Sequence, residues 1–217
     1  MLTETTSNAS QPACLRKSDS AAVAVTETTM PITIARVVTI TSVLFAGALI
    51  VVAHRRRPEL RTSDIALSVY FTAPTRATMV FAYAAIMAAL LSTAVVLAMD
   101  RHVAAQASAV ACCVGAALLA PVVATTQRDV MIVRSETVRR LHRHAAAAAF
   151  VAVGVAMAAS ACAAIAEANA VVVVPGFLGA VLVLRVLRSK PGAAHGLRQK
   201  CLLAMLGLWI VAIATTG

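Results

Sequence analysis

The stretch AAAAAFVAVGVAMAASACAAIA, residues 145–166, contains no charged side chain. A helix needs about 20 apolar residues to cross a hydrocarbon core of ~30 Å, and this stretch is long enough. A soluble helix of the same length would show regular polar positions for a solvated face, and this pattern is absent. The stretch therefore predicts a transmembrane helix. Its many small side chains allow close approach of neighbouring helices, with Gly154 and Ala158 as a candidate contact seam.

Five further apolar stretches of similar character fill the rest of the chain. Because all the runs are continuous rather than alternating, they favour helices over a membrane barrel. We predict an all-α, polytopic bundle of six transmembrane helices in residues 32–217, at about 32–53, 75–99, 103–126, 144–167, 170–187 and 201–216. Residues 1–31 are rich in Ser and Thr and poor in bulky apolar side chains, so we expect a disordered polar tail.

The composition supports a membrane protein and argues against a nucleic-acid binder. Of 217 residues, 60% are apolar and 13% charged, whereas soluble domains carry about 25% charged residues. The net charge of +10 comes from basic residues in short connections at helix ends, where they face lipid headgroups. We therefore expect membrane lipids as partners, with anionic headgroups at the Arg-rich loops. Abundant Arg and Ala with only three Lys is typical of a GC-rich bacterial genome, which favours a bacterial plasma membrane.

The basic residues alternate between connections, and this predicts the orientation. With the span ends included, the first, third and fifth connections carry five Lys or Arg each, the second carries Arg101 alone, and the fourth carries none. Connections rich in Lys and Arg stay in the cytoplasm. We therefore predict cytoplasmic first, third and fifth loops, with both termini outside.

Motifs for metals, haem, disulfides or known catalytic centres are absent from the sequence. The five cysteines show no CxxC or Cys/His ligand spacing, so we predict no disulfide framework and no metal cluster. All five histidines lie at span ends or in loops, whereas a haem ligand would have to lie within the bundle, and we expect no cofactor. The spans also lack a charge near their centres, which argues against proton pumping and voltage sensing. No P-loop, GxGxxG or GxSxG motif occurs.

Polar residues in two loops are the candidates for chemistry. The first loop contains Asp64 and Ser68 in the mildly apolar segment TSDIALSVYFTAPTR, which lies along the membrane surface or folds back over the bundle. The third loop contains Asp129 and His142. With Glu136 and His144 these residues could bind a metal, but neither HxxxH nor HxxH spacing occurs, and a solvated basic loop is the simpler interpretation.

Four short segments resemble the family called domain of unknown function 998, which comprises six-span bacterial and archaeal membrane proteins. These segments are SDIALSVYF (63–71), APVVATTQRD (120–129), TVRRLHRHAAAAAF (137–150) and HGLRQKCLLAMLGLWIVA (195–212). The family motifs correspond here to Leu67-Ser68, Pro121 with Asp129, His142, and Gly196-Leu197. The resemblance implies the six-span fold but no particular activity. In that family the first and third loops usually lie outside, which is opposite to the orientation that the charge count predicts.

Three functions remain open at the level of sequence. The first is a non-enzymatic multipass protein that binds lipid or a small hydrophobic ligand, because the bundle is apolar and its loops suit anionic headgroups. The second is a membrane-embedded lipid hydrolase or transferase that uses Asp64, Ser68, Asp129 and His142. The third is a small transporter, in which Pro121 and Pro175-Gly176 would break helices near a binding site.

Overall fold

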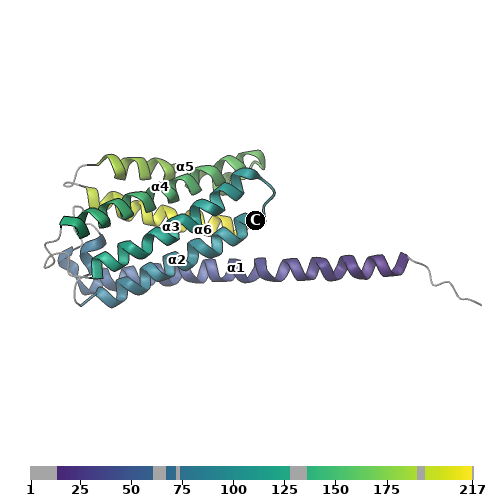
Figure 1. The fold of residues 1–217 in the computed structure, drawn as a ribbon, viewed down its shortest axis with the longest axis horizontal. Coiled ribbons are helices and arrows are strands. Elements are labelled where there is room, and N and C mark those ends of the chain that lie inside the picture. Colours follow the sequence, from purple (N-terminus) through teal and green to yellow (C-terminus); the bar gives the residue numbers. More distant parts are fainter. Residues whose placement is uncertain (1–13, 61–66, 72–73, 128–135, 190–193, 217) are drawn as a thin grey trace, which may run out of the picture. The chain divides into compact units, whose positions relative to one another are not determined.

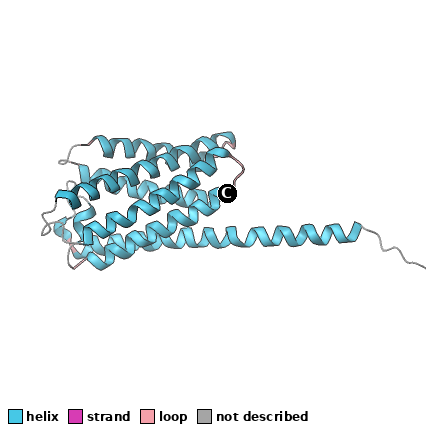
Figure 2. Ribbon diagram, viewed as in Figure 1, coloured by secondary structure: helices cyan, strands magenta, loops and turns pink. Residues whose placement is uncertain are grey.

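The computed structural model is built from helices. It describes residues 14–60, 67–71, 74–127, 136–189 and 194–216. The elements are α1 (Cys14–Arg56), two short 3-10 helices, η1 (Pro58–Leu60) and η2 (Leu67–Phe71), then α2 (Arg76–Ala98), α3 (Val103–Gln127), α4 (Glu136–Ala166), α5 (Ala170–Arg188) and α6 (His195–Thr216). All regular structure in these ranges is helical (Figure 2). Six of the helices contain a segment long and apolar enough to span a membrane, which confirms the predicted all-α, multipass membrane protein.

Several helices begin earlier than the apolar runs that predicted them. The compact bundle unit starts at Ala35, near the predicted boundary, but α1 itself begins at Cys14, within the segment assigned to a disordered tail. Helices α4 and α6 begin at Glu136 and His195, before the predicted starts at 144 and 201. Hydropathy marks only the part of a helix that lies in hydrocarbon, whereas backbone hydrogen bonding continues into the interface.

The bundle has two chemically different ends. At one end, here called the basic end, lie the last turns of α1, α3 and α5 and the first turns of α2, α4 and α6, and arginines are clustered in and beside most of these turns (Figure 1). At the other, the turn end, short turns join α2 to α3 and α4 to α5, close to the C-terminus (Figure 1). The alternation of charge along the sequence therefore becomes a difference between the two ends of the folded bundle.

Small residues bring α4 close to its neighbours. A Cβ added to Gly176 of α5 would lie 2.8 Å from both the Met157 carbonyl oxygen and the Ala161 Cβ of α4. A Cβ on Gly154 of α4 would meet Val183 of α5 at 3.1 Å. The seam around Gly154 is thus a contact within the chain, and the close approach supplies the van der Waals packing that holds helices together in lipid.

Three buried hydrogen bonds connect helices through hydroxyl groups. The Thr39 hydroxyl donates to Ser92 Oγ at 2.7 Å and joins α1 to α2. Ser108 Oγ of α3 donates to the Ala156 carbonyl of α4 at 2.7 Å. Trp209 Nε1 of α6 donates to Ser160 Oγ of α4 at 2.8 Å. Such bonds satisfy polar groups where lipid offers no partner.

The 3-10 helix η2 folds back over the bundle at the basic end, which was one of the two predicted arrangements for the first loop. Leu67, Tyr70 and Phe71 are each at most 3% exposed and pack with Ala53 of α1 and Met79 of α2. The apolar side chains of this loop are therefore buried against the ends of α1 and α2.

Candidate functional site

A groove of about 920 Å³, here called the outer groove, lies between α1, α2 and α6. Its charged or ionisable lining residues are His54, Arg55 and Lys200. The remaining lining residues carry no polar side chain: Val43, Leu44, Ala46, Gly47, Ala48, Ile50, Val51, Leu67, Ile86, Ala89, Leu203, Ala204, Leu206, Gly207, Leu208, Ile210 and Val211. Ligand pockets commonly have about 300–1,000 Å³ and an apolar wall with few polar groups, and the outer groove has both properties.

The polar residues of the outer groove gather at one of its ends. Arg55 lies in the last turn of α1 and Lys200 in the second turn of α6, so both are at the basic end. The His54 ring stacks on Tyr70, with 4.6 Å between ring centroids, and its Nδ1 lies 2.8 Å from the Ile50 carbonyl oxygen. These contacts fix the imidazole at the mouth of the groove. The outer groove therefore has an apolar wall and basic residues at its mouth.

A smaller hollow of about 90 Å³, here called the inner cavity, lies inside the bundle near the same end. Its polar lining residues are Tyr83, Thr126, His142 and Gln199. The side chains of four residues line both spaces and form the wall between them: Leu67, Ile86, Leu203 and Leu206. One layer of side chains thus separates the outer groove from the inner cavity.

Of the four predicted catalytic candidates, the structure places one side chain. His142 Nδ1 lies 3.0 Å from Thr125 Oγ1, and the ring lines the inner cavity. Asp64 and Asp129 lie outside the described residues, and for Ser68 only the backbone in η2 is described. The hydrolase hypothesis stays a prediction, since the proposed convergence involves residues without described positions. For the transporter hypothesis, α3 and α5 continue as helices through Pro121 and Pro175.

An ion-pair cluster lies at the start of α4, directly after the third loop, whose Asp129 is outside the described residues. Glu136, in the first turn of α4, pairs with Arg139, Arg140 and Arg143, the last two at 3.1 and 3.2 Å. The carboxylate at a helix N-terminus also interacts favourably with the helix dipole. Glu136 is therefore occupied in ion pairs, and among the described residues it forms no metal-ligand group with His142 or His144.

A polar chain at the basic end was not anticipated from the sequence. Ser189 Oγ lies 2.8 Å from His195 Nδ1, and the Gln199 amide nitrogen lies 3.1 Å from His195 Nε2. Ser189 donates its hydroxyl proton to the Val186 carbonyl at 2.7 Å. These side-chain contacts join the C-terminal end of α5 to the start of α6.

At the turn end, Asp100, His102 and Glu167 form a second group that sequence reasoning missed. One ligand atom from each lies within 4.8 Å of the others, and His102 Nε2 is 3.5 Å from Glu167 Oε1. The residues come from two turns that are distant in sequence, so no local spacing could have revealed them. Asp100 Oδ1 already accepts the His102 backbone N–H at 2.9 Å, and all three side chains are at least partly exposed. The group joins the α2–α3 turn to the α4–α5 turn.

Comparison with known proteins adds no relative. No family model, no curated protein and no solved structure matches the chain. The resemblance of four short segments to the domain of unknown function 998 family therefore stays a prediction. What the geometry establishes is a multipass membrane protein with an apolar groove whose entrance is basic.

Proposed function

We propose that this protein binds an anionic membrane phospholipid, with one acyl chain in the outer groove and the headgroup at His54, Arg55 and Lys200. The observation that carries the proposal is the separation of chemistry along the groove. All the charged or ionisable lining residues lie at one end, and the rest of the wall is apolar. A lipid has the same division between a charged head and an apolar tail.

The length of the groove also fits an acyl chain. On α1 it extends from Val43 to Arg55, which at ~1.5 Å per residue corresponds to about 18 Å. Half of a hydrocarbon core of ~30 Å is about 15 Å, the depth of one leaflet. The groove therefore matches a single lipid that lies in the leaflet at the basic end.

The headgroup contacts supply the selectivity in this proposal. An acyl chain gains little free energy on leaving lipid for the groove, because lipid tails are as apolar as Leu. A basic residue near the membrane surface contributes about 1 kcal/mol toward an anionic lipid, so Arg55 and Lys200 together predict a preference of roughly 30-fold over a zwitterionic lipid. Exchanging both for glutamine is expected to remove this preference.

Filling the groove tests the proposal. Gly47 lines the outer groove, and a Cβ added there meets no atom within 4 Å, so Gly47→Leu should project an isobutyl side chain into the groove and obstruct it. We expect the variant to lose the anionic lipid that co-purifies with the wild type, as measured by native mass spectrometry. Quenching of the single tryptophan, Trp209, by phospholipids with brominated chains should fall in parallel, because its neighbours Leu208 and Ile210 line the groove.

Ala117→Leu is the matched control. Ala117 is exposed on α3 and lines neither the outer groove nor the inner cavity, so a leucine there, which adds one carbon fewer than at Gly47, should leave lipid binding and quenching unchanged. Equal lipid content in the wild type and the Gly47→Leu variant would refute the groove as the binding site. Equal losses in both variants would mean that bulk lipid contact, not a specific site, sets the signal.

We also propose that the basic end faces the cytoplasm of a bacterial cell, with both chain termini outside. The support is the excess of Lys and Arg in the first, third and fifth connections over the second and fourth. Alkaline phosphatase fused after Thr216 should be active, and a green fluorescent protein fused after Glu59 in the first loop should fluoresce. The reverse pattern would invert the bundle and agree with the orientation common in the family that the chain resembles.

A further inference from the structure

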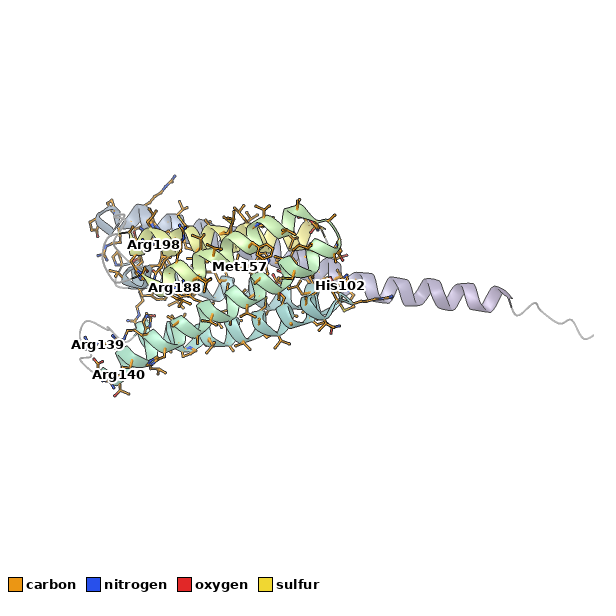
Figure 3. All side chains as sticks on the ribbon, turned by 90° about the horizontal axis from the view of Figure 1, so that it is seen from above. His102, Arg139, Arg140, Met157, Arg188 and Arg198 are labelled. Atoms are coloured by element: carbon orange, nitrogen blue, oxygen red, sulfur yellow. The ribbon has the colours of Figure 1, made fainter. Side chains whose placement is uncertain are left out.

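Three arginines line a third hollow at the basic end. This hollow has about 440 Å³ and is lined by Val181, Leu184, Arg185, Arg188, Ser189 and Arg198. Arg185 and Arg188 belong to the last turn of α5, and Arg198 lies in the first turn of α6 (Figure 3 labels Arg188 and Arg198). We refer to Arg185, Arg188 and Arg198 as the arginine triad.

The arginine triad has no acidic counterpart among the described residues. Two other groups of arginines at this end contain a carboxylate: Arg57 pairs with Glu59, and Arg139, Arg140 and Arg143 share Glu136. No described carboxylate lies within ion-pair distance of the triad, although Figure 3 shows Arg139 and Arg140 at the same end of the bundle. The triad hollow is therefore lined by positive charge without a carboxylate, whereas Glu136 and Glu59 each offset part of the charge beside them.

Two electrostatic features at the hollow favour an anion. The three positive charges around this hollow repel each other. An anion bound between them is attracted by all three, and this attraction offsets their repulsion. Cations near a helix N-terminus are also unfavourable, because the helix dipole is positive there, and α6 has no acidic residue in its first turn. An anion beside Arg198 would satisfy both the guanidinium and the helix end.

We propose that the arginine triad binds a phosphate group, with guanidinium N–H donors from α5 and α6 on its oxygens. The planar, multiple-donor guanidinium matches phosphate geometry, and arginine is favoured over lysine at such sites for that reason. The proposal goes beyond the lipid assigned to the outer groove, because the two hollows share no lining residue. The phosphate group belongs either to a lipid headgroup or to a soluble phosphate.

The test uses the full chain in uncharged detergent, with Gly47→Leu present throughout so that the outer groove is closed. Phosphatidic acid is the lipid probe and inorganic phosphate the soluble probe, and binding is followed by native mass spectrometry. A triple variant, R185Q/R188Q/R198Q, should reduce affinity for the phosphate-bearing probe by about 100-fold, since each basic residue near the surface contributes about fivefold. The control, R139Q/R140Q/R143Q, removes the same charge from a cluster already paired with Glu136 and should change affinity by less than about threefold.

The two probes identify the source of the phosphate. Phosphatidic acid binding that inorganic phosphate does not displace assigns the site to a lipid headgroup, and displacement assigns it to a soluble phosphate. Unchanged binding in the triad variant, equal losses in the control, or no binding of either probe to the parent protein overturns the proposal. Because Gly47→Leu is common to all samples, these outcomes leave the outer-groove proposal unaffected.

Discussion

Replacing Gly176 with alanine is expected to lower the free energy of unfolding by about 3 kcal/mol, the upper part of the range for overpacking a well-packed core. The new methyl group would lie 2.8 Å from the Met157 carbonyl oxygen and 2.8 Å from the Ala161 Cβ. Backbone atoms of α4 cannot rotate away as a flexible side chain can, so α4 and α5 must separate. Steric trapping in mixed micelles, or thermal unfolding in detergent, measures the loss.

Two other glycines provide controls for this substitution. A Cβ on Gly179, one turn further along α5, meets the flexible end of the Met157 side chain, which can move, so Gly179→Ala should cost less than Gly176→Ala. A Cβ on Gly47 meets no atom within 4 Å, so Gly47→Ala should be neutral or slightly stabilising. If all three variants unfolded alike, the short α4–α5 distance would not be a determinant of stability.

Replacing Trp209 with alanine is expected to cost about 3–5 kcal/mol, the usual range for removing a large buried aromatic side chain. Trp209 is 0% exposed and its Nε1 donates to Ser160 Oγ at 2.8 Å. Ser160 in turn donates to the Met157 carbonyl at 3.1 Å. The side chain thus fills the space between α6 and α4 and also takes part in a hydrogen-bond chain. Unfolding in mixed micelles measures the effect.

Ser160→Ala and Trp209→Phe separate the two contributions of this tryptophan. Ser160→Ala keeps the ring and removes the acceptor, and hydrogen bonds between membrane helices average about 0.6 kcal/mol. Trp209→Phe keeps much of the ring volume and should lie between Ser160→Ala and Trp209→Ala. A Ser160→Ala variant as unstable as Trp209→Ala would show that the hydrogen bond, and not packing, accounts for the stability. Gly176→Ala and Trp209→Ala act on the same turn of α4 and should not be additive.

Hydropathy was sufficient to predict the number of spans and most of their boundaries. The predicted third and fifth spans, 103–126 and 170–187, differ from α3 and α5 by a single residue at one end. Apart from the start of α1 at Cys14, the larger differences are at the basic end, where α4 begins at Glu136 because its first turns are charged and ion-paired rather than apolar. A run of apolar residues marks the part of a helix that lies in the hydrocarbon core of the membrane. Charged turns that extend the helix into the interface have low hydropathy, so hydropathy does not predict them.

The outer groove and the hollow lined by the arginine triad could not be predicted from the sequence, for a physical reason. Residues that line the outer groove, such as Gly47, Ile86 and Leu203, are of the same types as those that face lipid. Only the packing of α1, α2 and α6 distinguishes the groove wall from the lipid-facing surface. His142 was found because an ionisable residue beside an apolar run is conspicuous. Arg198 was visible in the sequence, but its proximity to Arg185 and Arg188 depends on how α5 meets α6.

The short turns at the turn end also have a consequence for biogenesis. Residues 99–102 and 167–169 are too few to bridge a bilayer of ~30 Å, so α2 with α3, and α4 with α5, must each enter the membrane together as a helical hairpin. The two turns carry few polar residues: Asp100, Arg101, His102, Glu167 and Asn169. A new arginine placed in either turn should therefore hinder the insertion of both helices of that hairpin, because the turn must cross the membrane with them.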